Sequence, residues 1–150
     1  MVITQGTSPV VGSATNDNAV AGRVGELISA AVAVGAGIVL TTGVAVNVTS
    51  IALTAGDWDV TGVVDFNPGA TTTTTSLQGG LSIVSATLGA QDSGFSNPFA
   101  IASTGVDASE VLPVVRFSLA GPTTVFLVAV AAFAISTLKA YGTIRARRVR

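Results

Sequence analysis

One segment in the middle of the chain constrains the fold more than any other feature. Between Asp57 and Phe66, apolar and polar residues alternate with a period of two. Only an extended strand places alternate side chains on opposite faces, so this pattern predicts a half-buried antiparallel strand that follows a turn at Thr54-Ala55-Gly56. Its inward face would carry Trp58, Val60, Gly62, Val64 and Phe66, and its outward face Asp57, Asp59, Thr61, Val63 and Asp65.

Later segments carry the same signature. Their apolar residues lie at even spacings with polar residues between them, which predicts further strands. Segment 123–135 differs because it is apolar on both faces, and such a strand needs a partner layer on each side. The sets that share a face are Leu77, Leu81 and Ile83, then Val115, Phe117 and Leu119, and finally Ile144 and Ala146, with Tyr141, Thr143, Arg145 and Arg147 opposite this last set.

Short strands separated by Gly- and Pro-containing turns are typical of β-sandwiches. We therefore predict an all-β chain, with an antiparallel β-sandwich of jelly-roll type over residues 24–150 and an extended N-terminal arm over residues 1–23. The segments Asn67–Thr75 and Gly89–Val111 are predicted as loops, and Gly121-Pro122 as a turn. The predicted core consists of Trp58, Val60, Val64, Phe66, Phe117 and Leu127.

The low charge content leaves a membrane protein as a rival. Apolar residues make up 49% of the chain and charged residues 10%, so either a partner covers much of the surface or part of the chain crosses a membrane. No charge occurs between Glu26 and Asp57, or between Arg116 and Lys139, and each window is long enough for a spanning helix. Polar residues in the first window and Gly121-Pro122 in the second disfavour this small two-helix membrane protein, so no membrane is expected.

The residue types exclude most familiar catalysis. The chain has no cysteine and no histidine, which removes disulfides, thiolate chemistry and histidine-dependent metal sites. Asp57, Asp59 and Asp65 suit either a calcium site or a solvated strand face, and the missing calcium-loop signature favours the solvated face. Ser136 and Lys139 would point to opposite faces of a strand and could not act together. We predict no catalytic, cofactor or metal site, and with a net charge of −1 no nucleic-acid partner.

Two parts of the chain resemble a known class of proteins. The segment Leu53-Thr-Ala-Gly-Asp-Trp-Asp-Val resembles a strand entry in small structural proteins of tailed bacteriophages and prophages, and segments 123–129 and 136–150 resemble the ends of the same proteins. The order of these motifs is similar to that of tumour-necrosis-factor-like jelly rolls. The resemblance implies a non-enzymatic virion protein on the particle surface, made in the bacterial host cytoplasm. It would be a capsid decoration (cement) protein that trimerises and stabilises the phage head, or a head or tail fibre component.

Self-assembly would explain the strand that is apolar on both faces. We predict a homo-oligomer, as a trimer, that binds the major capsid protein or other virion proteins. In the fibre alternative, the loop Gly89–Val111 would instead recognise a host surface glycan. The C-terminal arginines 145, 147, 148 and 150 are predicted to pair with acidic residues and to discourage sheet extension. The predicted subunit interface is Phe126, Val128, Val130, Tyr141, Arg145 and Arg147.

Overall fold

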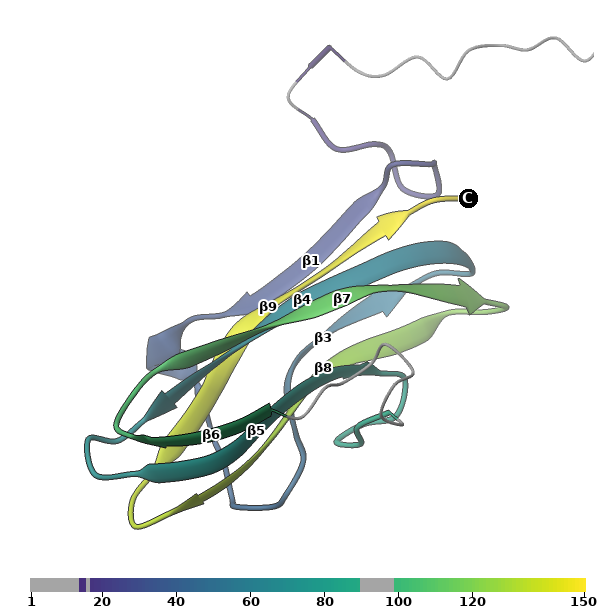
Figure 1. Ribbon diagram of the computed structural model, residues 1–150. Coiled ribbons are helices and arrows are strands. Elements are labelled where there is room, and N and C mark those ends of the chain that lie inside the picture. The colour runs from purple at the N-terminus through teal and green to yellow at the C-terminus, as the bar shows by residue number, and fades with distance from the viewer. Residues whose placement is uncertain (1–13, 16, 90–98) are drawn as a thin grey trace, which may run out of the picture.

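The computed structural model describes residues 14–15, 17–89 and 99–150. In this part of the chain, the elements are β1 (Leu27–Val32), η1 (a 3-10 helix, Val34–Ala36), β2 (Ile38–Val39), β3 (Val46–Leu53), β4 (Gly56–Pro68), β5 (Thr73–Ser82), β6 (Phe99–Thr104), β7 (Ala108–Leu119), β8 (Thr123–Ala134) and β9 (Leu138–Arg148). They form two antiparallel sheets that pack face to face (Figure 1). Sheet A has the order β1-β9-β4-β7, with β2 also paired to β9, and sheet B has the order β3-β8-β5-β6.

The strand pairing is nested around the middle of the chain. Strand β5 pairs with β6, β4 with β7, β3 with β8, and β1 with β9, all antiparallel. Apart from the two-residue strand β2, the described strands are the eight that pair in this way, four in each sheet, and this arrangement is that of a jelly roll. The predicted fold class, an all-β antiparallel sandwich of jelly-roll type, is therefore confirmed.

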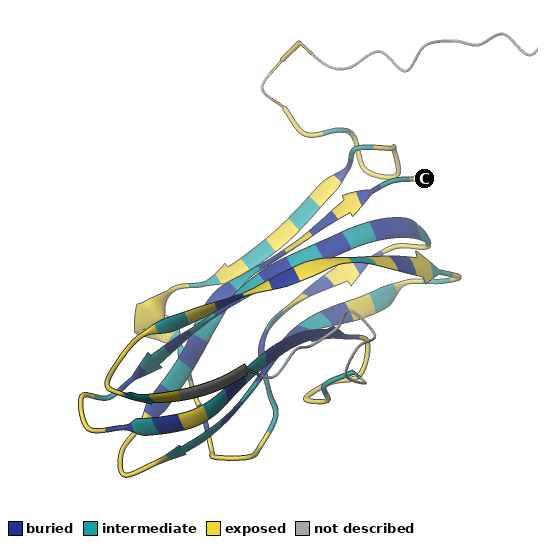
Figure 2. Cartoon of the chain, in the orientation of Figure 1, coloured by how far each residue is buried: buried dark blue, intermediate teal, exposed yellow. Residues whose placement is uncertain are grey.

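Strand β4 shows how the sequence builds the core. From Trp58 to Pro68 its residues alternate between buried and partly exposed, as the banding in Figure 2 shows along the strands. Burial of one such apolar side chain contributes about 1.5–3 kcal/mol to stability. The core cluster between the sheets contains all six residues predicted from the pattern: Trp58, Val60, Val64, Phe66, Phe117 and Leu127.

The predicted loop Asn67–Thr75 is wrong in its bounds, because β4 continues to Pro68 and β5 begins at Thr73, which leaves only residues 69–72 as the connection. The threonine run extends the sheet because its hydroxyls find partners inside the sandwich. Thr72 is fully buried, and its Oγ1 donates to the carbonyl oxygen of Thr137 at 2.6 Å. Thr74 is also buried and its hydroxyl lies 2.8 Å from that of Ser103 on β6. With their hydroxyls bonded, β-branched threonines favour extended backbone.

The predicted loop Gly89–Val111 is wrong in part, because β6 and the start of β7 lie within it. Strand β6 reads Phe-Ala-Ile-Ala-Ser-Thr, and its small residues give too weak an alternation to identify a strand by pattern. Residues 90–98 of this segment fall outside the described residues. Ile83 was predicted to share a face with Leu77 and Leu81, which are buried, but it lies beyond the end of β5 and is exposed.

The two uncharged windows fold as strands. The first contains β1, β2 and β3, and the second contains β8. Within the residues that the structure describes, no helix has the length and apolar character needed to cross a bilayer. The two-helix alternative is therefore wrong, and the abundant Val and Thr explain why these windows prefer extended backbone.

At Gly142, β9 leaves no room for a side chain against the backbone of β4. This residue has a φ of +147°, a conformation that residues with a side chain rarely adopt. A Cβ atom built there would overlap the carbonyl oxygen of Val63 on β4. Because β9 lies between β1 and β4 in sheet A, the overlap could not be relieved by moving an edge strand.

Candidate functional site

Charge is divided unequally between the two sheets. The strands of sheet B contain no Asp, Glu, Lys or Arg. Transfer of a charge out of water is costly, so a partner covers an uncharged face more easily than a charged one. Every charged residue that belongs to a described strand lies in sheet A: Asp57, Asp59, Asp65, Glu110, Arg116, Lys139, Arg145, Arg147 and Arg148.

The outward face of sheet B is centred on β8. This strand directs Val125 and Leu127 into the core, so Phe126 and Val130 point outward, where both are partly buried. The register pairs Phe126 with the exposed Ser50 and places the exposed Ala52 opposite the exposed Thr124, whereas Val130 pairs with the partly buried Gln78 of β5. We call this surface the neutral face, and define it by Ser50, Ala52, Thr124, Phe126 and Val130.

Val128 also points away from the core cluster, yet it is fully buried within the single chain. Its register neighbour on β3 is Asn47. The Asn47 side chain donates to Ser85 Oγ and accepts from the backbone N–H of Ala86, both at 2.7 Å. These bonds hold the segment after β5 against this part of the sheet. Val128 is therefore not available to a neighbouring subunit, whereas Phe126 and Val130 retain exposed surface.

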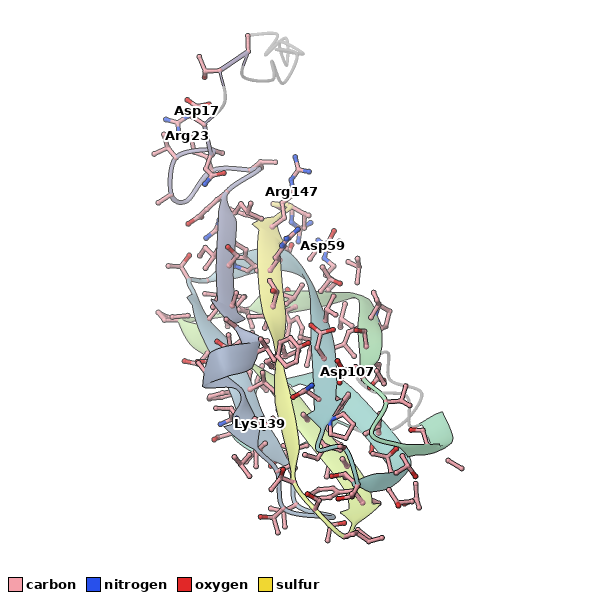
Figure 3. The ribbon with its side chains drawn as sticks, turned by 90° about the vertical axis from the view of Figure 1, so that its left-hand side faces the viewer. Asp17, Arg23, Asp59, Asp107, Lys139 and Arg147 are labelled. Atoms are coloured by element: carbon pink, nitrogen blue, oxygen red, sulfur yellow. The ribbon has the colours of Figure 1, made fainter. Side chains whose placement is uncertain are left out.

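The other half of the predicted interface lies on the opposite side of the sandwich. Tyr141, Arg145 and Arg147 alternate along β9 with buried residues and project from the outward face of sheet A, where Figure 3 labels Arg147. Burial and the negative charges of Asp65 and Asp107 raise the pKa of Tyr141. Because the outward faces of a two-layer sandwich point away from each other, one contact patch can include only one of the two predicted sets.

Two of the three carboxylates of β4, those of Asp57 and Asp65, are already bonded within the chain. Oδ2 of the buried Asp57 lies 2.9 Å from Arg116 Nη2 and 2.8 Å from Arg150 Nε. A hydrogen bond from Ser118 and the Arg116 guanidinium hold the pKa of Asp57 below its usual value. Asp65 accepts a hydrogen bond from Ser109. The described residues contain no group of three or more acidic, His or Cys side chains placed to hold a metal ion.

A buried ionic cluster joins the beginning of the sandwich to its end. Arg148 Nε lies 2.9 Å from Glu26 Oε2, and the guanidinium carbon lies 4.2 Å from the centre of the Trp58 ring. The same guanidinium donates to the carbonyl oxygen of Ala55 at 2.9 Å and to the hydroxyl of Thr54. We call Glu26, Thr54, Trp58 and Arg148 the terminal clamp, because it fixes both ends of the domain to the turn between β3 and β4.

The sequence pattern contained a signal for the clamp. Arg148 is an even number of residues from the inward-facing Ile144 and Ala146, so it lies on the same face of β9 as they do. Arg145 and Arg147 lie on the opposite face. Arg148 is accordingly only 5% exposed. The prediction that the C-terminal arginines protect a sheet edge is wrong, because β9 lies between β1 and β4 in sheet A. The expected pairing with acidic residues does occur for Arg148 with Glu26 and for Arg150 with Asp57.

Acid should weaken the fold through Glu26 and Asp57. A hydrogen bond from the backbone N–H of Gly22 lowers the pKa of Glu26 despite burial, and Arg148 lowers it further. A carboxyl group whose pKa is lowered by folding stabilises the folded state fully at any pH above its ordinary pKa, which is 4.5 for Glu26 and 3.8 for Asp57. This contribution is lost as the pH falls through the lower pKa that the group has in the folded protein. The Tm from circular dichroism is therefore expected to be steady above about pH 4.5 and to fall progressively at lower pH.

The Glu26→Gln variant is the control, because its side chain cannot ionise. It should have a lower Tm than the parent at neutral pH and a smaller decrease in acid. A parent Tm that stayed constant throughout the acid range would contradict the proposed role of these two carboxylates.

Comparison with known proteins gives structural matches only. No known protein family matches the sequence, and no curated protein matches it. The chain is similar to the crystal structure of the infectious bursal disease virus VP2 subviral particle, with a TM-score of 0.42 and 14% identity over 82% of this chain and 30% of that one. It is also similar to the structure of infectious bursal disease virus Gt strain, with a TM-score of 0.40 and 14% identity over 80% and 28% of the two chains. The chain thus spans less than a third of the structures it matches, and similarity at this level does not decide the function.

Proposed function

We propose that this chain is a non-enzymatic structural protein of a virion, and that it decorates the capsid by binding copies of itself and the major capsid protein. The observation that carries this proposal is the complete absence of charged residues from the strands of sheet B. A face without charges can be removed from water by a neighbouring subunit without an unpaired ion being buried. The opposite, charged face of sheet A would then remain in contact with water.

The architecture agrees with this role without deciding it. Jelly rolls form viral capsid domains and also lectin domains, so the fold alone permits several functions. The resemblance of segments 53–60 and 123–129 to small phage structural proteins favours the virion, and a location on the particle surface after synthesis in a bacterial host. Within the jelly roll, segment 53–60 enters β4 and segment 123–129 begins β8, the strand at the centre of the neutral face.

The proposed subunit contact is the neutral face, and the proposed oligomer is a trimer. Phe126 and Val130 would supply the apolar area, at about 25 cal/mol for each Å² removed from water. The exposed Ser50, Ala52 and Thr124 lie around Phe126 and add no charge. This assigns self-assembly to sheet B and excludes Tyr141, Arg145 and Arg147, on the far side of the sandwich, from the same contact.

A lysine on the neutral face should abolish the oligomer. Thr124 is exposed near the end of sheet B, so Thr124→Lys can keep its fold while it places a charge in the contact. Sedimentation velocity is expected to give a trimer for the parent chain and a monomer for Thr124→Lys. The matched control is Ser29→Lys, which places the same side chain on an exposed position of β1 in sheet A and should remain trimeric.

Two results would overturn the assignment of this contact. One is a parent chain that sediments as a monomer at micromolar concentration, and the other is a Thr124→Lys variant that assembles like the parent. Val128→Asp is not a suitable test, because Val128 is buried within the single chain and its replacement would destabilise the monomer itself.

Decoration is tested on the particle. A decoration protein should co-purify with phage heads at a fixed copy number, and heads assembled without it should release their genome at a lower temperature. If the chain is absent from purified particles, or if its removal leaves thermal release unchanged and only host adsorption is reduced, cement function is rejected. The last outcome would favour the fibre alternative.

A further inference from the structure

The outward face of sheet A contains a hollow of about 340 Å³. It lies between β4 and β9, which run side by side in Figure 3, and it is open to solvent. A volume of this size is within the usual range for small-ligand sites. Its lining residues are Thr61, Gly62, Val63 and Asp65 of β4 and Thr143 and Arg145 of β9.

A β-bulge next to the hollow fixes one of its walls. Between the pairs Val60–Val115 and Gly62–Leu112, β4 has the single residue Thr61, whereas β7 has two residues. The Thr61 hydroxyl donates to the carbonyl oxygen of Leu112 at 2.8 Å, which ties its side chain to the bulged strand. Bulges often re-aim side chains beside binding sites, and this one orients the wall formed by Thr61.

Several polar groups of the hollow have donor or acceptor atoms that are not used within the chain. Within the described part of the chain, Arg145 and Thr143 make no side-chain hydrogen bond or ion pair. Asp65 accepts from Ser109 through Oδ1, which leaves Oδ2 available. The register pairs Thr61 with Arg145 and Asp65 with Tyr141, so the two charged positions lie four residues apart, roughly 13 Å along the strand. Arg145 and Asp65 are therefore too far apart to neutralise each other readily, and the small residues Val63 and Thr143 lie between them.

We propose that this hollow binds an acidic saccharide. A sugar carboxylate would accept two parallel hydrogen bonds from the Arg145 guanidinium. Sugar hydroxyls would donate to Asp65 Oδ2 and exchange hydrogen bonds with Thr143, and the Val63 methyl groups would contact the apolar side of the ring. A neutral sugar would leave Arg145 without a partner, and a simple inorganic anion would make no use of Asp65. A nucleic-acid backbone is disfavoured by the carboxylates of Asp59 and Asp65 on the same face.

This site does not depend on the proposed subunit contact, because the two lie on opposite faces of the sandwich. Digalacturonate and galactobiose are suitable probes, since they differ in their carboxylates and share the linked-ring framework. In a ¹H–¹⁵N NMR titration, digalacturonate is expected to give saturable shifts at residues 61–65 and 143–145, and galactobiose much weaker ones. Arg145→Gln should weaken digalacturonate binding about tenfold or more, because it removes a charge-assisted pair.

The matched control is Lys139→Gln, which removes a cation from the same strand and the same outward face, outside the hollow. Digalacturonate affinity should be unchanged in this variant. The proposal is overturned if digalacturonate gives no saturable shifts, or if Lys139→Gln weakens binding as much as Arg145→Gln. It is also overturned if sulfate or a short single-stranded oligonucleotide produces the same shifts with equal affinity, because the face would then attract anions without selecting a sugar.

Discussion

Replacement of Arg148 by alanine is expected to lower the free energy of unfolding by about 3–5 kcal/mol. The Arg148 guanidinium is buried, and its removal would leave the Glu26 carboxylate without its partner inside the protein. The change also removes the cation stacked on the Trp58 ring and leaves the Ala55 carbonyl without its donor. Unfolding in urea, followed by the fluorescence of the only tryptophan, measures this loss directly.

The neighbouring residue supplies the control for this prediction. Arg147→Ala removes the same side chain from an exposed position on the outward face, and should change the free energy of unfolding by no more than about 0.5 kcal/mol. The double variant Glu26→Gln with Arg148→Met should recover part of the loss, because no unpaired charge then remains buried. Equal effects of Arg147→Ala and Arg148→Ala would show that the terminal clamp does not stabilise the fold.

Gly142→Ala should be at least as damaging, with a loss of about 4 kcal/mol or more, or no folded protein at all. The backbone of Gly142 has a φ that alanine rarely adopts, and the added Cβ would overlap the carbonyl oxygen of Val63. The chain can relieve this only by separating β9 from β4, which would break the centre of sheet A. Far-UV circular dichroism and the yield of monodisperse protein report the outcome.

Gly121→Ala is the matched control for Gly142→Ala. Gly121 lies in the turn before β8, and a Cβ built there has open space around it. Its stability should remain within about 0.5 kcal/mol of the parent. If Gly142→Ala instead proved as stable as Gly121→Ala, the close approach of β9 to β4 would not exist in solution.

The sequence was sufficient to predict the buried face of a strand wherever the alternation of apolar and polar residues depends only on extended backbone. Alternation along β4 requires no knowledge of its neighbours, so Trp58 and Phe66 could be placed on one buried face from their spacing. The same reasoning placed Phe117 and Leu127 in the core. Several alternating segments with turns between them were then enough to predict a jelly-roll sandwich.

The pattern was insufficient where a distant segment changes the environment of a residue. Arg148 and Glu26 are 122 positions apart, and nothing local to either indicates that they pair. Val128 was expected at a subunit contact because no sequence signal shows that Asn47 holds the segment containing Ser85 against that face. The hollow beside Arg145 depends on the register between β4 and β9, which the period of either strand does not determine.

Nested pairing also determines the order in which the strands can pair while the chain emerges from the ribosome, N-terminus first. Among the described strands β1 pairs only with β9, so the first of these strands to be made cannot pair until β9 has been made. The inner pair of β5 and β6 can form while translation continues. Sheet A cannot be completed until β9, which ends at Arg148, has left the ribosomal exit tunnel. Such a late closing step slows folding and leaves the edge of β4 unpaired in the meantime. A truncated mRNA that ends before β9 would therefore yield a chain in which the edge of β4 is unpaired, and this chain should have a strong tendency to aggregate.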